Sequence, residues 1–277
     1  MNTNISITLA FAMTAISVLA ADMKLPQTST QGGMPLMQAL AGRKTSRDFS
    51  QKELAPEALS ALLWAANGIN RPDGHRTAPT GLNVQDIDVY VVLPSGAYIY
   101  NAKDNLLVLV NEGDFREFVG KQDFTKTAPL NLFYVQNLSK AMKGDENTNA
   151  RHGGIHAGAI MQNVYLFCAS ENLSCVARDY FDRDEMARVL KLGDKQRIII
   201  SQTVGYPSDT VLIGIDAAKK IALENAGAAE TDVQKLKCEL DTENGVQIYE
   251  VEFKKGGVEY DYDIDAKTGS IIKSEKE

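Results

Sequence analysis

The chain has 277 residues, which is more than one small hydrophobic core needs and suits a medium domain followed by a small one. Hydrophobic residues make up 44% of the chain and charged residues 23%, as in ordinary globular proteins. The net charge of −7 and the pI near 5.2 argue against nucleic acid as a partner. A bound anion must therefore be held by a local group of basic residues.

Residues 5–21 form an uncharged, apolar stretch that ends in small residues. Serine and threonine side chains dilute this stretch, and it is short for a helix that spans a bilayer. The pattern predicts a signal peptide over residues 1–20, although the α-amino group is its only positive charge. We therefore expect export to the periplasm or cell envelope, with an uncleaved N-terminal anchor as the alternative.

Small and polar residues over 21–33 predict a linker, and two helices are expected after it. The first covers residues 35–42, with Gly42 as its stop and an apolar side formed by Leu36, Met37 and Leu40. The second covers residues 55–68 and buries one face, formed by Leu59, Leu62, Leu63 and Ala66.

The stretch between these helices, "GRKTSRDFS", concentrates positive charge in an otherwise acidic chain. Its cations are Arg43, Lys44 and Arg47. Arg43, Thr45 and Arg47 are alternate residues, so an extended segment can direct all three towards one phosphate, which guanidinium groups bind well. The alternative is a polar turn, with Ser50 and Glu53 forming a capping box for the next helix. The spacing leaves both interpretations open.

A second polar cluster, "HRTAPTGLNVQ", covers residues 75–85. Its proline and glycine restrict the backbone, while Thr80, Asn83 and Gln85 supply hydroxyl and amide groups. Such groups can bind the edge of a planar heterocycle. An ordinary loop before the strand at Val89 is the alternative.

The rest of the first two hundred residues alternates strands and helices irregularly. Strands are expected within residues 86–100 on both sides of a Pro-Ser-Gly turn, and at 105–110, 130–137, 174–181 and 197–207. Helices are expected at 112–120, 152–172 and 183–193. The longest of them places Ile160, Val164, Phe167 and Cys168 on one face. Without a regular βαβ repeat, an α+β layered fold is expected rather than a doubly wound one.

The cysteines and histidines predict neither a disulfide framework nor a metal site. Three cysteines are too few for a framework in a chain of this size, although a Cys168–Cys175 bridge stays open in an oxidising compartment. His152 and His156 are four residues apart, but two glycines separate them and no acidic residue stands at metal-ligand spacing. A helix-entry or ligand-contact role is the alternative for these histidines.

The composition changes after Pro207. A helix is expected over residues 216–227, followed by three strands at 233–241, 246–257 and 258–269. Alternation in "IYEVEF" and "YDYDID" predicts a sheet with one wet face. These features indicate a separate module of roughly sixty residues, near the lower size limit for a single core.

Four landmarks in order resemble the nitroreductase family of flavoproteins, and most of all its compact branch, which includes dehydrogenases that act on peptide azolines. The landmarks are "GRKTSRDFS" with the following helix, "RTAPTGLNVQDIDVYVV", "AGAIMQNVYLFCASENLSC" and "TVGYP". The resemblance covers residues 34–207. It implies a layered α/β/α domain with a central, mostly antiparallel sheet, and a homodimer with FMN at each subunit interface.

The resemblance also implies site residues. The family's R-x-S-x-R motif contacts the FMN phosphate and ribityl chain. It is matched here, with threonine in place of serine, by Arg43, Lys44, Thr45 and Arg47. The family's P-S-x-x-N-x-Q segment reaches the isoalloxazine from the partner subunit. It is matched here by Pro79, Thr80, Asn83 and Gln85. Backbone groups near the flavin N5 are implied for residues Val176 to Asp179.

The chain departs from the family in its phosphate site. Many members add a basic pair after the Gly-x-Pro strand, and this chain has none between Pro207 and Lys219. Phosphate binding must then rely on Arg43 and Arg47, with Arg76 or His156 as further candidates. The family has no universal acid or base, so no catalytic residue is assigned.

Residues 213–277 resemble a PepSY domain, on landmarks that include Tyr249, Val251, Tyr260, Asp265 and Gly269. Such domains occur in exported or membrane-associated proteins and are thought to modulate or inhibit partners. They have no catalytic constellation, and core or strand-pairing roles are expected for the aromatic residues.

Together these patterns predict an exported FMN-dependent oxidoreductase that transfers hydride or electrons between flavin and a small organic or peptide-derived substrate. NAD(P)H is a cytoplasmic reductant, so an exported member is expected to exchange electrons with another redox partner. The alternative function is a non-catalytic, flavin-binding scaffold that presents the PepSY domain to a peptide or protease. The missing basic pair and the threonine in place of serine motivate this alternative.

Overall fold

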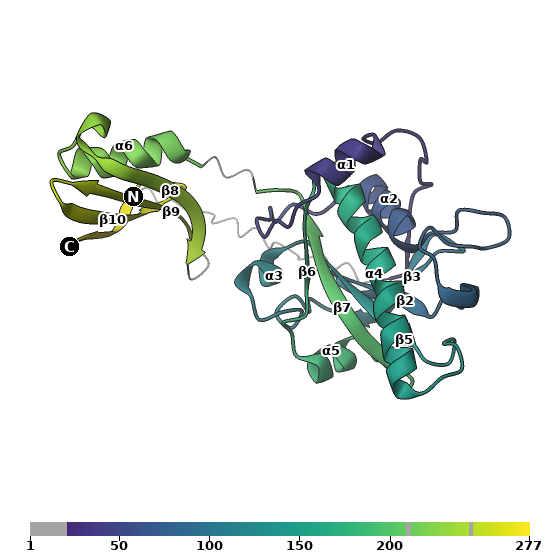
Figure 1. The fold of residues 1–277 in the computed structure, drawn as a ribbon. Helices are drawn as coiled ribbons and strands as arrows, with labels where there is room; N and C mark the ends of the chain where they lie inside the picture. Colours follow the sequence, from purple (N-terminus) through teal and green to yellow (C-terminus); the bar gives the residue numbers. More distant parts are fainter. Residues whose placement is uncertain (1–20, 209–211, 244–245) are drawn as a thin grey trace, which may run out of the picture.

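A computed structural model describes residues 21–208, 212–243 and 246–277. The predicted signal peptide over residues 1–20 lies outside them. Among the described helices, none is long and apolar enough to cross a membrane. The described residues from 21 to 208 and those from 212 to 277 form two units, each built around its own sheet (Figure 1).

The first unit contains a seven-stranded sheet in the order β1-β4-β3-β2-β5-β7-β6, in which every neighbouring pair is antiparallel. Its strands are β1 (Met23–Lys24), β2 (Ile87–Leu93), β3 (Gly96–Asn101), β4 (Leu106–Glu112), β5 (Leu130–Asn137), β6 (Ser174–Arg178) and β7 (Gln196–Gly205). The central strands are rich in β-branched and aromatic residues, which pack well on a pleated surface.

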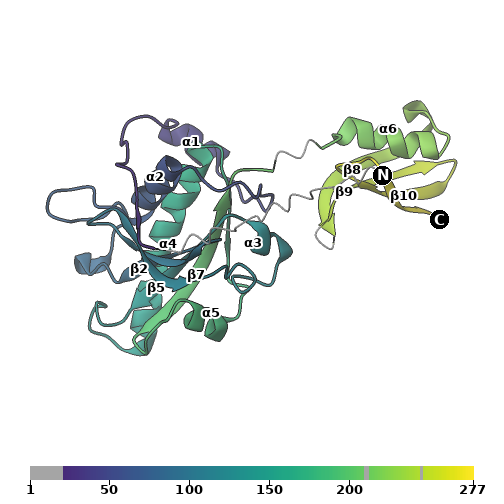
Figure 2. The ribbon, with the colours of Figure 1, turned by 180° about the vertical axis from the view of Figure 1, so that it is seen from behind.

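Helices cover both faces of this sheet (Figure 1, Figure 2). One face carries α1 (Leu36–Gly42), α2 (Pro56–Asn67) and the long α4 (Glu146–Ser170), while the other carries α3 (Asp123–Thr127) and α5 (Arg183–Val189). In β2, Val89 and Val91 join the hydrophobic cluster under α2 and α4, while Tyr90 and Val92 join the cluster under α5. Alternate residues thus bury both faces. This confirms the predicted layered fold with an antiparallel sheet.

The helix predicted over residues 112–120 is wrong. These residues form the end of β4 and a turn, in which the Phe118 N–H bonds to the Phe115 carbonyl at 3.0 Å. Gly113 has φ of 126°, which no helix accommodates. The short helix of this region is α3, a few residues later.

The segment predicted as a linker enters the fold. Met23 and Lys24 pair with β4, and Leu25 is buried in the core at 3% exposure. The Pro26 carbonyl accepts hydrogen bonds from Asn105 at 2.7 Å and from the Ser60 hydroxyl at 2.6 Å. The polar composition concealed this role because only one side chain of the segment is fully buried.

The capping box predicted at Ser50 and Glu53 is also wrong. Helix α2 begins at Pro56 after the N-cap residue Ala55, and the Ser50 hydroxyl accepts instead from the Lys52 N–H at 3.2 Å. Proline at the first helical position supplies the start signal. Its fixed φ suits a helix, and the N–H that it lacks would have no partner within the helix at this position. The predicted buried face of α2 is confirmed, with Leu59, Leu62, Leu63 and Ala66 each at most 5% exposed.

The second unit packs one helix, α6 (Ile215–Asn225), against a four-stranded sheet in the order β11-β10-β9-β8. The strands are β8 (Gln234–Glu243), β9 (Val246–Lys255), β10 (Val258–Asp265) and β11 (Ile271–Lys276), and a 3₁₀ turn, η2 (Glu230–Asp232), precedes them. The sequence predicted three of these strands. The fourth, β11, is a mostly exposed edge strand and lacks the alternation that marks the others.

Candidate functional site

The basic segment, residues 43–47, lies outside helices and strands, beside β6 at the edge of the first sheet. The Ser46 N–H donates to the Cys175 carbonyl at 2.9 Å, and the Ser46 and Ser174 hydroxyls are 3.1 Å apart. A little further on, the Ser50 N–H donates to the Tyr206 carbonyl at 2.9 Å. These bonds dock the segment against β6 and the residue that follows β7.

Tyr165 of α4 joins the basic segment to the end of β6. Its hydroxyl accepts the Ala177 N–H at 2.8 Å and lies 3.3 Å from the Thr45 hydroxyl. Its ring lies under the Arg43 guanidinium, 5.4 Å from the ring centroid. Tyr165 itself is 8% exposed. The sequence placed Tyr165 in a helix but did not identify it as a site residue.

The cations of the basic segment are available to an anion. Arg43 is half-buried, whereas Lys44 and Arg47 are exposed. Within the described part of the chain, these three side chains form no ion pair. Guanidinium groups near a hydroxyl such as Thr45 are a donor set that suits a phosphate.

The polar loop, residues 80–85, has a strained backbone that includes a 3₁₀ turn, η1 (Gly81–Asn83). Three of its residues are left-handed without being glycine: Leu82 at φ 53°, Asn83 at φ 54° and Gln85 at φ 48°. Each such residue costs about 1 kcal/mol, less for asparagine. Leu82 is also 88% exposed, so its own burial does not hold the loop in place.

Hydrogen bonds within the loop, and from Gln85 to the preceding residues Gly74 and Arg76, hold part of this conformation. The Gln85 N–H donates to the Thr80 hydroxyl at 3.0 Å, and the Gln85 amide donates to the Gly74 carbonyl at 3.0 Å and to Asn83 at 3.1 Å. Arg76 donates to Gln85 Oε1 at 2.9 Å. The Gln85 amide is therefore occupied within its own chain. The exposed residues of the predicted ring-binding set are Pro79 and Asn83.

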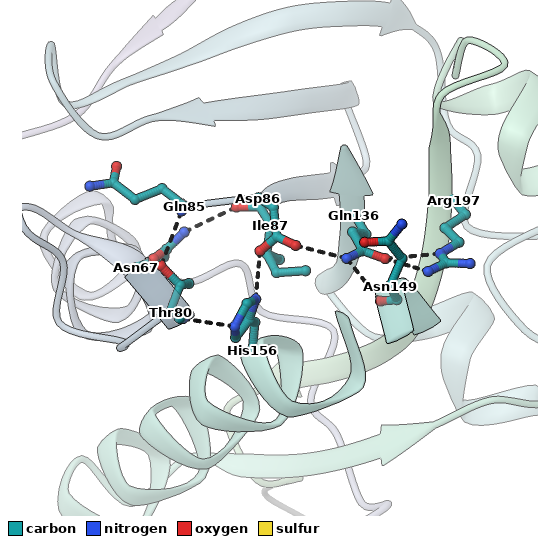
Figure 3. Close-up of polar contacts among 10 residues, drawn as sticks. Asn67, Thr80, Gln85, Asp86, Ile87, Gln136, Asn149, His156 and Arg197 are labelled. Atoms are coloured by element: carbon teal, nitrogen blue, oxygen red, sulfur yellow. Dashed lines mark hydrogen bonds and ion pairs between the residues drawn. The ribbon is translucent and has the colours of Figure 1, made fainter. Parts of the chain in front are cut away.

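Arg76 and His156 do not contact the basic segment of their own chain, so the suggestion that either assists phosphate binding stays a prediction without support from these contacts. Arg76 also donates to the Asn67 carbonyl at 2.9 Å, and burial lowers its pKa. His156 is 4% exposed and bonds to Asp86 and to Gly81 of the polar loop (Figure 3). Both side chains hold the polar loop instead.

A buried network continues from the polar loop into the core (Figure 3). His156 Nε2 accepts the Gly81 N–H at 2.9 Å, and Nδ1 lies 2.7 Å from Asp86 Oδ1. Asp86 Oδ2 accepts from Gln136 Nε2 at 2.7 Å. Arg197 donates to Gln136 Oε1 from two nitrogens, at 2.9 and 2.7 Å. The sequence indicated His156 as a candidate for helix entry, ligand contact or phosphate binding and gave no signal for Asp86.

The structure does not bring the basic segment and the polar loop to one place within the chain. The first contacts Tyr165 and the second contacts His156, both on α4. The nine positions from 156 to 165 correspond to about 14 Å along a helix at 1.5 Å per residue. The two predicted halves of the site therefore lie at different points along α4.

The end of β6 is fixed by a buried arginine that the sequence did not single out. Arg178 is 6% exposed and donates to the Thr203 hydroxyl at 2.8 Å and to Asn131 at 2.6 Å. Burial lowers the pKa of Arg178 to about 10. Next to it, Asp179 is exposed and pairs with Arg183, so its carboxylate points to α5.

The remaining titratable candidates do not form a second centre in the described residues. His152 and His156 stack at 6.1 Å in α4, which is helical through both glycines. No described group of three or more acidic, histidine or cysteine side chains is placed to bind a metal ion. Cys168 and Cys175 are buried free thiols, and burial together with Cys175 raises the pKa of Cys168.

Comparisons with known proteins match both units. A family model described as "Nitroreductase family" matches residues 40–206, and one described as "Peptidase propeptide and YPEB domain" (PepSY) matches residues 212–275. A crystal structure of a candidate nitroreductase from Ralstonia eutropha JMP134 is 38% identical with a TM-score of 0.66. The match covers 70% of this chain and 93% of that one.

Two curated proteins are similar to separate parts of the chain. A candidate nitroreductase from Methanocaldococcus jannaschii is 25% identical over 169 residues, which cover 57% of this chain and 85% of that protein. An uncharacterised protein from Streptococcus pyogenes serotype M6 is 41% identical over 70 residues, which cover 25% of this chain and 54% of that protein. The first match supports an oxidoreductase.

Proposed function

The chain belongs to the nitroreductase family and carries a PepSY domain after that part, and from this premise we propose that it is an exported FMN-dependent oxidoreductase. The family consists of oxidoreductases that typically bind flavin. To the family's general activity we add three proposals. The flavin is FMN, hydride or electrons are transferred to a small organic or peptide-derived substrate, and the protein is exported. The observation that carries the proposal is a basic segment that Ser46 docks against β6 and whose three cations form no ion pair among the described residues.

The basic segment fits the phosphate end of FMN. Arg43 and Arg47 would bind the phosphate, and Lys44 would add charge at its rim. The Thr45 hydroxyl is placed by Tyr165 and would bind a phosphate or ribityl oxygen. Because no basic pair follows β7 before Lys219, these residues would supply most of the positive charge.

The end of β6 and the polar loop fit the ring end. When bound, FMN supplies two-electron redox chemistry, and the protein binds, orients and shields it. Residues Val176 to Asp179 would present backbone groups from a strand that Arg178 and Tyr165 hold in place. Asn83 has an exposed amide that would bind the ring edge, whereas Gln85 would act by holding the loop. We assign no catalytic acid or base.

We further propose a homodimer in which the polar loop of one subunit completes the site of its partner. Two observations support this. The loop and the basic segment contact α4 at positions about 14 Å apart along the helix axis, and the apolar side of α1 is exposed, with Leu36 at 63% and Met37 at 74%. Burial of such a surface between subunits is favourable. Sedimentation should give twice the 30.3 kDa chain mass; a monomer that binds FMN tightly would contradict the dimer.

The proposal is tested by flavin content. The purified protein should show flavin absorbance, and Arg43→Ala with Arg47→Ala should raise the Kd for FMN about 100-fold or more, because two charge-assisted hydrogen bonds are lost. Lys103→Ala with Lys143→Ala removes the same charge from exposed sites and should leave the Kd unchanged. An apoprotein that refuses added FMN would contradict the proposal.

The same spectra address the electron partner and the alternative function. For an exported enzyme, NADPH should bleach the flavin slowly, and rapid bleaching with turnover of an acceptor would count against an extracytoplasmic partner.

The missing basic pair after β7 favours the second candidate, a non-catalytic scaffold that presents the PepSY domain. A flavin-free Arg43→Ala, Arg47→Ala variant that still binds a PepSY partner would support the scaffold.

A further inference from the structure

We propose that Asp86 and His156 are positioning residues: Asp86 fixes the tautomer of His156, and His156 thereby holds the polar loop in its strained conformation. The loop is the part of the chain that we assign to the flavin ring, so this inference rests on the proposed function. His156 bonds directly to the loop backbone, at the Gly81 N–H (Figure 3). Neither side chain touches the flavin in this assignment.

The tautomer follows from the donors around the imidazole. A backbone N–H can only donate, so His156 Nε2 must present a lone pair to Gly81. The proton of the neutral ring is therefore on Nδ1, which donates to Asp86 Oδ1 at 2.7 Å. A ring protonated on Nε2 would place an N–H against the Gly81 N–H and release the loop.

The contacts on the side of Asp86 away from His156 require a carboxylate at this position. Arg197 donates twice to Gln136 Oε1, and Gln136 Nε2 also donates to the Asn149 carbonyl at 3.1 Å, so the Gln136 amide has one orientation. Asp86 therefore receives a donor from Gln136 as well as from His156. The two donors meet different oxygens, Oδ1 and Oδ2. A carboxylate accepts at both, whereas a carboxamide would place its NH2 group against one of the donors.

Burial gives this arrangement its effect. Asp86 is 1% exposed, His156 4% and Gln136 0%, so water does not readily replace a lost partner. Close packing also restricts the network: a Cβ on Gly153 of α4 would lie 2.5 Å from Gln136 Oε1. The loop that depends on this network contains three left-handed non-glycine residues, and such strain persists only where the surroundings enforce it.

Asp86→Asn tests the chain of bonds with almost no change in shape. With Gln136 fixed, the Asn amide must donate towards His156, so the imidazole proton moves to Nε2. His156→Phe removes the acceptor altogether, while His156→Gln offers an amide oxygen to Gly81 and an amide N–H to Asp86. His152→Phe is the matched control, since His152 lies one turn earlier on α4 and bonds to Arg151.

Two readouts are independent of flavin. The chain has three histidines, so ¹⁵N-histidine labelling gives three imidazole spin systems, one of which should show the Nδ1–H tautomer in the wild type and Nε2–H in Asp86→Asn. The rate of hydrogen exchange in the peptide spanning residues 79–86 should rise about five- to tenfold in Asp86→Asn and His156→Phe. This factor corresponds to the loss of one buried hydrogen bond. His156→Gln should stay within about threefold of wild type.

The third readout is FMN affinity. The Kd should rise about five- to tenfold in Asp86→Asn and His156→Phe and recover in His156→Gln. Unchanged tautomer and exchange in Asp86→Asn would overturn the inference, as would a lowered affinity in His152→Phe equal to that of His156→Phe. A wild type that binds no FMN would overturn the proposed function, and the tautomer and exchange data would still decide whether the pair holds the loop.

Discussion

Single side chains with several partners organise the candidate site. The Tyr165 hydroxyl contacts both the basic segment and the backbone of β6, and His156 contacts both the polar loop and Asp86. Tyr165 and His156 both lie on α4, but they contact different parts of the candidate site. Residues of this kind determine where ligand-binding groups lie without belonging to a recognisable motif.

Tyr100 of β3 makes the stability of the first unit depend on pH in the alkaline range. Burial raises the pKa of Tyr100 to about 12, and the nearby Arg76 opposes this rise only in part. In the unfolded chain a tyrosine ionises near pH 10. Between about pH 10 and 12 the unfolded state therefore binds fewer protons than the folded state, and the free energy of unfolding falls as pH rises.

Tyr100→Phe should therefore lose less stability than the wild type between pH 9 and pH 11. The urea midpoints of the two proteins at both pH values provide the measurement. Tyr180→Phe is the control, because Tyr180 is 62% exposed and should change the alkaline loss very little. An equal loss in wild type and Tyr100→Phe would show that other groups cause the alkaline destabilisation.

At the scale of elements, strand β1 is the clearest addition to the predicted fold. Leu25, which follows it, is 3% exposed, and we expect Leu25→Ala to lower the free energy of unfolding by about 2–4 kcal/mol through lost burial and a cavity. Urea denaturation measures this value. The neighbouring Lys24 is exposed, so Lys24→Ala should change stability by less than about 0.5 kcal/mol. Equal effects of both variants would contradict the core role of Leu25.

Elements with a strong pattern were predictable, and elements without one were not. The buried faces of α2 and α4 and the strands β2 to β7 have clear apolar runs or periodicity, and the sequence identified them. The edge strands β1 and β11 were missed because each buries little and owes its conformation to hydrogen bonds with a neighbouring strand. The turn at residues 112–120 resembles a helix in composition, but Gly113 breaks it.

At the scale of the whole molecule, each unit has its own core. The core of the second unit joins α6 to the inward faces of its sheet, through residues such as Tyr249, Val251 and Tyr262. The described clusters of the first unit contain no residue of the second. We therefore expect residues 212–277 and residues 21–208 to fold as separate fragments, although the smaller one is near the size limit for independent stability.

Calorimetry of the full chain should show two unfolding transitions, each reproduced by one fragment. FMN should raise the Tm of the transition that belongs to residues 21–208 and leave the other unchanged. A single transition shared by both units would contradict their independence. A shift of both transitions by FMN would mean that flavin binding is linked to the PepSY domain.

The order of most elements and the cluster of positive charge in the basic segment could be read from the sequence, because periodicity and composition are local properties, while the family followed from the resemblance of four motifs in order. Which groups are free to bind a ligand became visible only in the tertiary structure. It left Arg43, Lys44 and Arg47 without ion pairs in the described chain, and it engaged the Gln85 amide within its own loop. The contact between His156 and Asp86 joins residues seventy positions apart. Such pairings depend on how helix and sheet pack, and no local pattern records them.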